Sequence, residues 1–285
     1  MRLLITADLH FNHAVSKPLA IDLIDKMNTA GGDVLLVVGD TGVADGDVIE
    51  QCLSRFKFDG PKLFVAGNHE LWTNTADSYR LFMEDLPRRV RALGWQWLET
   101  DPFRAGDVAI VGSVGWYDYS FAQSSLEIPE RFYAEKLSPG AAAYLGGYDA
   151  LLAGDDVSPI AREIVARWND GKFVKLGRPD RAFMDECLSR LTVACEANAD
   201  VRTIVAAVHH LPFRELLPPP KSAQWDFAKA YLGSERIGQL LMNYPNVTKL
   251  YCGHSHLPGE VTVGHIHAIN VGSGYRHKVY HTLDI

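Results

Sequence analysis

Short apolar runs alternate with longer segments of helical spacing near the start of the chain. Leu3 to Ala7, Val34 to Val38 and Leu63 to Ala66 are largely apolar and partly β-branched, which is typical of strands covered on both faces of a sheet. Between them, Lys17 to Ala30 and Asp45 to Phe56 carry apolar residues at helical intervals. The pattern predicts three consecutive strand–helix units and therefore an α/β fold.

Later apolar runs predict further strands. Val201 to Val208 and Val247 to Cys252 read as buried strands, and Asp180 to Asn198 has the spacing of a long helix. Phe213 to Asp226 contains three consecutive prolines, so we expect a loop there. The remaining segments of strand character are expected to belong to a second sheet layer, and they are Glu260 to Val263, His265 to Val271 and Lys278 to Leu283.

The stretch from Tyr119 to Pro179 interrupts the strand–helix alternation. It is rich in aromatic and helix-compatible residues and is punctuated by proline and paired glycine. We expect a mostly helical insertion over the crevice, within a single domain that spans residues 1–285. Its aromatic residues could form a small local core, or Tyr117 or Tyr119 could flank a substrate. Such an insertion would set substrate preference or build a dimer contact.

Polar side chains follow each of the first three predicted strands. The first ends in Asp8-Leu9-His10, the second in Gly39-Asp40, and the third in Gly67-Asn68-His69-Glu70. In an open α/β sheet, ligands bind in the crevice beyond the carboxyl ends of the strands. A turn with an incidental histidine would explain any one motif, but three consecutive strand ends with metal-capable side chains indicate a metal site.

Two later strands end in histidines, and together the strand ends supply seven potential ligands. His209-His210 follows Val208, and Gly253-His254-Ser255-His256 follows Cys252. Two metal ions that share a carboxylate fit this mixture, and nitrogen-plus-oxygen donors suit manganese, with iron, zinc, nickel or cobalt as alternatives. Such a pair forms the clamp used for in-line displacement at phosphorus. The seven residues are Asp8, His10, Asp40, Asn68, His209, His254 and His256.

Composition excludes several other classes of protein. The apolar fraction of 47% and the charged fraction of 22% are ordinary for a globular chain. The net charge of −7 disfavours a surface that binds the phosphate backbone of nucleic acids. No apolar run reaches the roughly 18 residues that a membrane span needs. The four cysteines are scattered, so we expect reduced thiols and a cytoplasmic protein.

The five motifs, in this order, resemble those of the calcineurin-like metallophosphoesterase superfamily. The resemblance implies a four-layer αββα sandwich of two mixed β-sheets flanked by helices. It also implies that Asp40 bridges two divalent ions. The first ion would be held by Asp8, His10 and His256, and the second by Asn68, His209 and His254.

The resemblance also implies roles beyond ligation. His69 would contact the phosphoryl oxygens and protonate the leaving alkoxide as a general acid. Of the adjacent pair we take His209 as the ligand, so that His210, with Asn68 and His69, would lie on the substrate side. The remaining histidines are expected to be non-ligands, namely His13, His265, His267, His277 and His281.

The leading hypothesis is a binuclear phosphoesterase that hydrolyses a small phosphomonoester or phosphodiester by attack of a metal-bridging hydroxide. A nuclease is the first alternative, although the acidic charge makes nucleic acid an unlikely partner. A catalytically idle metal-binding scaffold is the second. The sequence leaves open the substrate, the preference between monoester and diester, and the oligomeric state.

Overall fold

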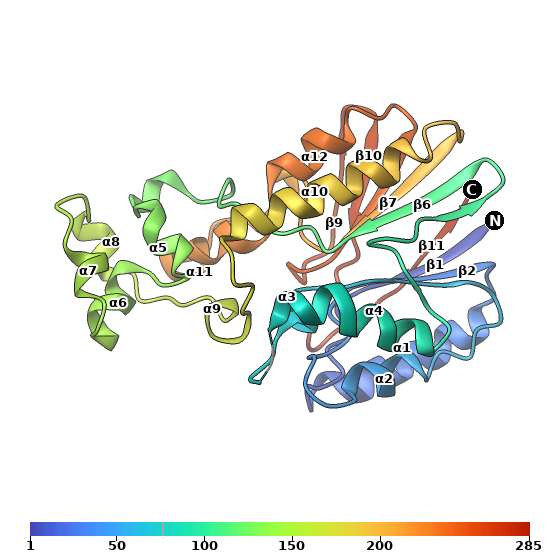
Figure 1. Cartoon of the computed structure of the whole chain (residues 1–285), viewed down its shortest axis with the longest axis horizontal. Helices are drawn as coiled ribbons and strands as arrows, with labels where there is room; N and C mark the ends of the chain where they lie inside the picture. The colour runs from blue at the N-terminus through green and yellow to red at the C-terminus, as the bar shows by residue number, and fades with distance from the viewer. Residues whose placement is uncertain (76) are drawn as a thin grey trace.

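The computed structural model describes residues 1–75 and 77–285. Two mixed β-sheets face each other at the centre of the molecule, and helices cover their outer sides (Figure 1). The predicted α/β sandwich of two mixed sheets is therefore confirmed.

The first sheet carries the first three predicted strands side by side. Its strand order is β11-β1-β2-β3-β4, with parallel pairing from β1 to β4 and antiparallel pairing between β1 and β11. Every residue of β2 is buried, as expected for a central parallel strand. The strands are β1 (Arg2–Thr6), β2 (Val34–Val38), β3 (Lys62–Val65), β4 (Gln96–Trp97) and β11 (His281–Asp284).

The second sheet has the order β5-β6-β7-β8-β10-β9. Its centre is parallel, and antiparallel strands stand at both edges. The strands are β5 (Phe103–Ala105), β6 (Val108–Ser113), β7 (Thr203–Val208), β8 (Val247–Cys252), β9 (Gly259–Val263) and β10 (Ile266–Asn270).

Alternate residues of each strand serve two different cores. Leu3 and Ile5 of β1 pack in a cluster with Ile110 of β6 and Val205 of β7, between the two sheets. Leu4 belongs instead to the larger cluster, which it shares with the helices. Period-two alternation in β1 thus seals both faces of the first sheet.

Helices cover both outer faces. In Figure 1, α1, α2 and α4 lie below the first sheet, and α10 and α12 lie against the second. Their bounds are α1 (Ser16–Ala30), α2 (Val48–Leu53), α3 (Ser78–Arg80), α4 (Leu86–Ala92), α10 (Asp180–Glu196), α11 (Ala223–Ala228) and α12 (Glu235–Leu241). Single turns complete the chain at η1 (His69–Leu71), η2 (Leu81–Asp85), η3 (Ser124–Leu126), η4 (Arg214–Leu216) and η5 (Lys229–Tyr231).

Two local expectations were wrong. The last predicted strand joins the first sheet as β11, because its residues 281–284 pair with β1, and it does not join the second layer. The segment expected to be a loop after Phe213 contains the helix α11, which begins just after the prolines and is capped by the side chain of Ser222.

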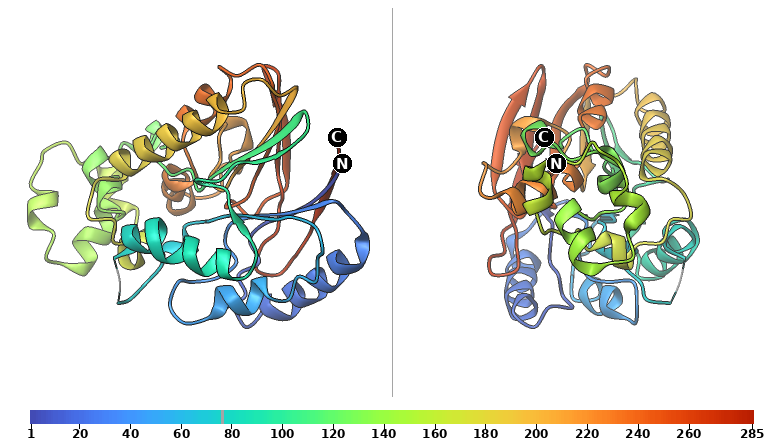
Figure 2. Two further views of the ribbon diagram at one scale, coloured as in Figure 1. Left: turned by 45° about the vertical axis from the view of Figure 1, so that its right-hand side comes forward. Right: turned by 90° about the vertical axis from the view of Figure 1, so that its left-hand side faces the viewer.

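The segment from Tyr119 to Pro179 is dominated by short helices and projects from one end of the molecule (Figure 2). These helices are α5 (Glu130–Ala134), α6 (Pro139–Leu145), α7 (Asp149–Leu152), α8 (Pro159–Glu163) and α9 (Asp170–Phe173). Its outer part has a core of its own, the outer cluster, which consists of Phe132, Leu137, Ala141, Ala142, Val157 and Ala161.

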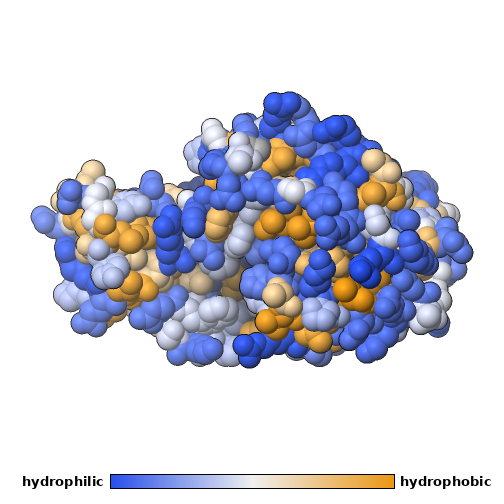
Figure 3. Space-filling model, turned by 90° about the horizontal axis from the view of Figure 1, so that it is seen from below, coloured by the Kyte–Doolittle hydropathy of each residue, from blue (hydrophilic) through white to orange (hydrophobic). Residues whose placement is uncertain are grey.

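The face seen from below in Figure 3 is mainly hydrophilic, with apolar side chains in separate small patches. That pattern is usual for a surface in contact with water. Among the helices that the structure describes, none has the length and apolar character needed to cross a bilayer.

Candidate active site

The carboxyl ends of β1, β2 and β3 are held together by the backbone beyond the strands. The amide of Asp8 donates to the carbonyl of Gly39 at 3.0 Å, and that of His10 donates to the carbonyl of Asp40 at 2.8 Å. The second sheet meets this edge because the amide of His254 donates to Asp8 Oδ1 at 3.0 Å. Side chains from both sheets therefore converge on one seam.

Left-handed backbone conformations are concentrated at this seam. Most residues with a side chain avoid positive φ, and strained conformations of this kind gather at functional sites. Five of the seven residues proposed as ligands have positive φ: Asp8 (54°), His10 (43°), Asp40 (56°), His254 (68°) and His256 (58°). The turns after the strands thus aim these side chains inward at a conformational cost.

Gly67 is required by close approach. A Cβ atom at this position would lie 2.2 Å from Asp40 Oδ1 and 2.7 Å from His209 Nε2. Real Cβ atoms essentially never come closer than 3.0 Å to such neighbours. The third strand end can therefore reach the carboxylate of Asp40 only without a side chain.

The inward-facing side chains form two groups that share Asp40. Within each group the potential ligand atoms lie within 4.8 Å of one another, and the groups are Asp8, His10, Asp40 and His256, and Asp40, His209 and His254. Asp40 Oδ2 lies 3.7 Å from His10 Nε2, and Asp40 Oδ1 lies 3.4 Å from His209 Nε2. One carboxylate thus faces both groups, as a shared ligand of two ions must.

Buried donor atoms are left free for a metal. Asn68 is 1% exposed, and its Nδ2 donates to Asp170 Oδ1 at 2.9 Å, so its Oδ1 faces the site. His209 Nδ1 is bonded to the carbonyl of Val38 at 2.9 Å, which directs Nε2 inward. Within the described chain, Asn68 Oδ1 has no hydrogen-bond partner, and His209 Nε2 has only the ion-pair contact of 3.4 Å with Asp40 Oδ1. Buried polar atoms without partners are costly, and divalent ions would satisfy both.

Without metal ions, the buried carboxylates and imidazoles of the site shift one another's pKa values. Burial alone would raise the pKa of Asp40, but His69 and His209 hold it well below its usual value. Burial raises the pKa of Asp8 to about 7. Burial would lower the pKa of His209, yet the Asp40 and Asp8 carboxylates raise it to about 9. Ions would displace that proton, since a ligating histidine must be neutral.

The place of Glu70 in the third motif suggested that its side chain would enter the crevice beside Asn68 and His69. The structure shows that it does not. Its buried carboxylate accepts the backbone N–H groups of Asp40 at 2.9 Å and Gly67 at 2.6 Å. It also accepts both the N–H and the hydroxyl of Thr41 at 2.6 Å. The turns after β2 and β3 leave these donors without a strand partner, so Glu70 ties the two turns together.

His69 lies at the mouth of the site. Its amide donates to Asp40 Oδ1 at 3.0 Å, and its Nε2 lies 3.9 Å from Asp40 Oδ2. Its ring stacks on Trp72, with ring centroids 3.7 Å apart. Trp72 lies three residues later, one turn along η1, so a helical interpretation of this turn would have found the pair.

His210 lies behind the site, outside both ligand groups. Its Nδ1 is bonded to the carbonyl of Val114 at 2.8 Å, and its ring packs 4.3 Å from that of His254. Burial, followed by the nearby His209, lowers its pKa to about 3. His210 is not among the residues that line the pocket, so its position does not support the expected contact with substrate.

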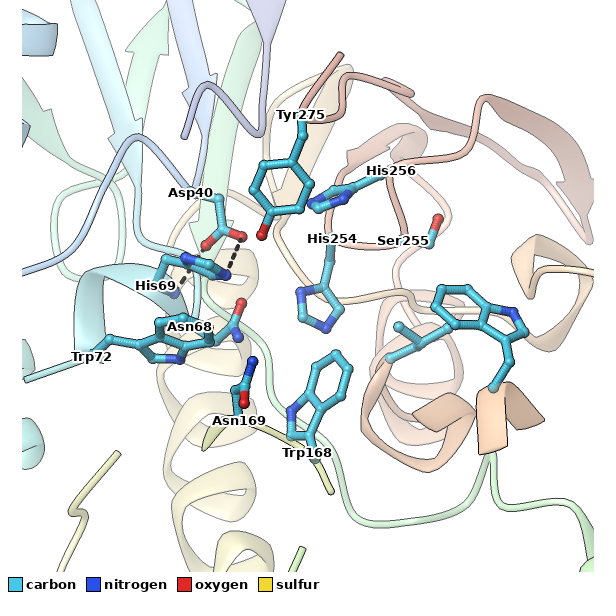
Figure 4. A pocket seen from close by; sticks show the side chains of 12 residues that line it. Asp40, Asn68, His69, Trp72, Trp168, Asn169, His254, Ser255, His256 and Tyr275 are labelled. Atoms are coloured by element: carbon cyan, nitrogen blue, oxygen red, sulfur yellow. Dashed lines mark hydrogen bonds and ion pairs between the residues drawn. The ribbon is translucent and has the colours of Figure 1, made fainter. Parts of the chain in front are cut away.

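A pocket of about 190 Å³ opens over Asp40, His69 and His254 (Figure 4). Trp168 lies on the side opposite Tyr275, and Trp72 stands beside His69. Tyr117 and Tyr119 do not line it, because their hydroxyls are bonded to the buried carboxylates of Asp170 and Asp180. The full lining is Asp40, Asn68, His69, Trp72, Trp168, Asn169, Trp225, Leu232, His254, Ser255, His256 and Tyr275.

The remaining histidines lie elsewhere. His13, His265 and His277 are exposed, His267 pairs with Glu260 at 2.6 Å, and His281 contacts the carbonyl of Val271. None of these five belongs to either ligand group.

Comparison with known proteins agrees with the site geometry. The family model described as calcineurin-like phosphoesterase matches residues 1–258. No curated protein sequence matches the chain. A solved structure of phosphopantetheinyl hydrolase from Mycobacterium tuberculosis is 21% identical over 96% of this chain and 89% of that chain, with a TM-score of 0.66. A dimetal phosphatase from Danio rerio is 14% identical over 99% of this chain and 91% of that chain, with a TM-score of 0.55. At these identities, the two structures establish a shared fold.

Proposed function

The chain belongs to the calcineurin-like phosphoesterase family, and on that premise we propose that it hydrolyses a small phosphoric ester with the help of two divalent metal ions. The single observation that supports this most strongly is the carboxylate of Asp40, which belongs to both groups of potential ligands. Two ions that flank a phosphoryl group stabilise both the attacking and the leaving oxygen.

The residues present fit such a pair of ions. Asp8, His10 and His256 would hold one, Asn68, His209 and His254 the other, and Asp40 both. When bound, the ions supply a Lewis acid and lower the pKa of water enough for it to act as a nucleophile at neutral pH. Oxygen and imidazole ligands suit manganese, which we propose as the native metal.

The protein's own side chains would position the substrate and protonate the leaving group. Hydrolysis forms a P–O bond to a water oxygen and breaks the P–O bond to the leaving group, whose oxygen takes up a proton. We assign that proton donation to His69, which lines the pocket. Its position is fixed by the hydrogen bond that its backbone N–H donates to Asp40 Oδ1. Asn68 and His69 then stand on the substrate side of the centre.

The four cysteines support a reducing location. All four are free and buried, which suits a cytoplasmic protein. A small substrate, rather than nucleic acid, suits both the small pocket and the net charge of −7.

The test uses bis(p-nitrophenyl) phosphate and p-nitrophenyl phosphate as substrates of the manganese-loaded protein. We expect Asp40→Asn and His69→Ala each to lower kcat at least a hundredfold, in line with the loss of a metal bridge or of a general acid. His265→Ala is the control, since this exposed histidine lies in the turn between β9 and β10 and outside both ligand groups. Metal content per chain is measured for all variants. Wild-type turnover in both Asp40→Asn and His69→Ala would exclude the proposed chemistry.

A further inference from the structure

The lining of the pocket over the candidate metal centre is of two kinds. The polar residues Asp40, His69 and His256 are of the kind that metal-assisted hydrolysis needs. Aromatic and aliphatic residues make up much of the rest, and they include Trp72 beside His69, Trp168 opposite Tyr275, and also Trp225 and Leu232. The family chemistry needs the polar residues but does not explain the aromatic ones.

Asp170 turns the two best-placed indoles into apolar walls. Trp72 Nε1 donates to Asp170 Oδ1 at 2.6 Å, and Trp168 Nε1 donates to Asp170 Oδ2 at 2.7 Å. Both rings are half-buried, whereas Asp170 is fully buried behind them. Because the polar atom of each ring is already bonded, each ring presents only carbon to the pocket.

The walls are also held rigidly. Trp168 stacks on Tyr231, with ring centroids 5.4 Å apart and planes within 8° of parallel. Trp72 stacks with His69 and with Phe173, with ring centroids 3.7 and 5.0 Å apart. A ligand ring that packs here meets pre-ordered side chains, so binding costs little side-chain entropy.

The charge of the lining restricts the phosphoryl group. Among the described residues that form this pocket, none is Lys or Arg. A phosphomonoester carries between −1.5 and −2 charges at neutral pH, whereas a phosphodiester carries only one. Lys278 approaches the centre from outside the pocket lining, where its Nζ donates to the carbonyl of Asp8. A pocket lined by no Lys or Arg suits the singly charged ester.

We propose that the Asp170-braced indoles of Trp72 and Trp168 form a subsite for one planar, uncharged arm of a phosphodiester. This proposal rests on the proposed function and names its substrate class. The volume agrees, because a cavity of about 150 Å³ accommodates benzene, and this pocket measures about 190 Å³. The phosphoryl group would face Asp40 and His69 while the arm packs against Trp168.

Three phosphate esters separate the effect of an aromatic ring on binding from the effect of charge. Dimethyl phosphate and methyl phenyl phosphate have the same charge and differ in one ring, whereas methyl phenyl phosphate and phenyl phosphate share the ring and differ in charge. Their dissociation constants for the metal-loaded protein are measured by titration calorimetry, and their inhibition constants by competition with bis(p-nitrophenyl) phosphate. The calorimetry is done in the His69→Ala background, which keeps all the proposed metal ligands, so that slow turnover does not add heat of hydrolysis to the heat of binding.

The ring should tighten binding about tenfold or more, as stacking on an aromatic side chain does. Trp168→Ala should abolish most of that gain. Tyr144→Ala is the control and should preserve it, because Tyr144 belongs to the same projecting segment but is 82% exposed and lies outside the pocket. Phenyl phosphate should bind no more tightly than methyl phenyl phosphate.

The outcomes distinguish this proposal from the function on which it rests. Equal binding of the dimethyl and methyl phenyl esters, or an undiminished ring effect in Trp168→Ala, would overturn the subsite. A tenfold preference for phenyl phosphate would overturn the diester assignment. Failure of the protein with two ions to hydrolyse any p-nitrophenyl ester would overturn the proposed function, whatever the calorimetry shows.

Discussion

Replacement of Glu70 by glutamine tests whether one buried carboxylate holds two strand-end turns together. The change keeps the shape of the side chain but exchanges one acceptor oxygen for an NH₂ donor. Oε2 accepts from the amides of Asp40 and Gly67, and Oε1 accepts from Thr41 and Gly42. Whichever oxygen is lost, at least two backbone or side-chain donors then face another donor.

The size of the effect follows from those contacts. A hydrogen bond to a charged group contributes about 1.5–3 kcal/mol, so two lost bonds cost roughly 3–6 kcal/mol. Part of this returns, because a neutral amide is cheaper to bury than a carboxylate. We expect Glu70→Gln to lower the free energy of unfolding by about 3 kcal/mol and the Tm by roughly 6–12 °C.

The assay is urea unfolding of the metal-free protein, followed by circular dichroism at pH 7. Glu135→Gln makes the same chemical change at an exposed position and should alter stability by less than about 0.5 kcal/mol. The variant with glutamine at position 70 should also bind manganese more weakly, since the turn that carries Asp40 is held by fewer hydrogen bonds whichever oxygen is replaced. A loss below about 1 kcal/mol at an unchanged urea slope would refute the bracing role.

Three further changes test other parts of the site. Gly67→Ala should abolish tight manganese binding, measured by calorimetry, because its methyl group would lie 2.2 Å from Asp40 Oδ1; binding within twofold of wild type would contradict this. Asp170→Asn should weaken binding of methyl phenyl phosphate several-fold and dimethyl phosphate less, because an amide cannot accept all four bonds that reach the carboxylate. His210 has a pKa of about 3 when folded, so its unfolded form binds more protons between about pH 3 and 6.5, and stability falls as pH drops through that window. Urea unfolding of metal-free protein should lose up to about 1.4 kcal/mol per pH unit from this group, and His210→Asn should flatten the slope; equal slopes would count against it.

Much of the seam was predictable because its signals are local. Asp8 and His209 directly follow an apolar run, and Asp40 follows one after a single glycine. Each places a polar side chain at the end of a strand, and parallel strands bring such ends to one edge. The structure gathers six of the seven expected ligands into two groups and turns the free oxygen of the seventh, Asn68, toward them. Their roles as ligands stay predictions.

Other features have no local signal. Asp170 is 102 residues from Asn68, and no pattern around it indicates that its carboxylate would be buried under two indoles. Which sheet the last strand joins depends on edge pairing with β1, about which hydropathy is silent. Glu70 stands in a motif beside two functional residues, yet it faces the backbone, since the direction of a side chain in a tight turn depends on donors from another strand.

Because the tip of the projecting segment has the outer cluster as its own core, its sequence can vary independently of the pocket. Phe132 and Leu137 pack with their own small neighbours, whereas Trp168 and Asp170 reach inward to the pocket. The two regions meet at a narrow junction, where the amide of Ser138 donates to the carbonyl of Ala166 at 3.0 Å. Phe132 and Leu137 precede Ser138, so a graft between Ser138 and Ala166 that again covers these two side chains with apolar residues would leave the indole walls in place. The surface at the tip of the projecting segment can therefore change in evolution while the pocket and the candidate metal centre stay the same.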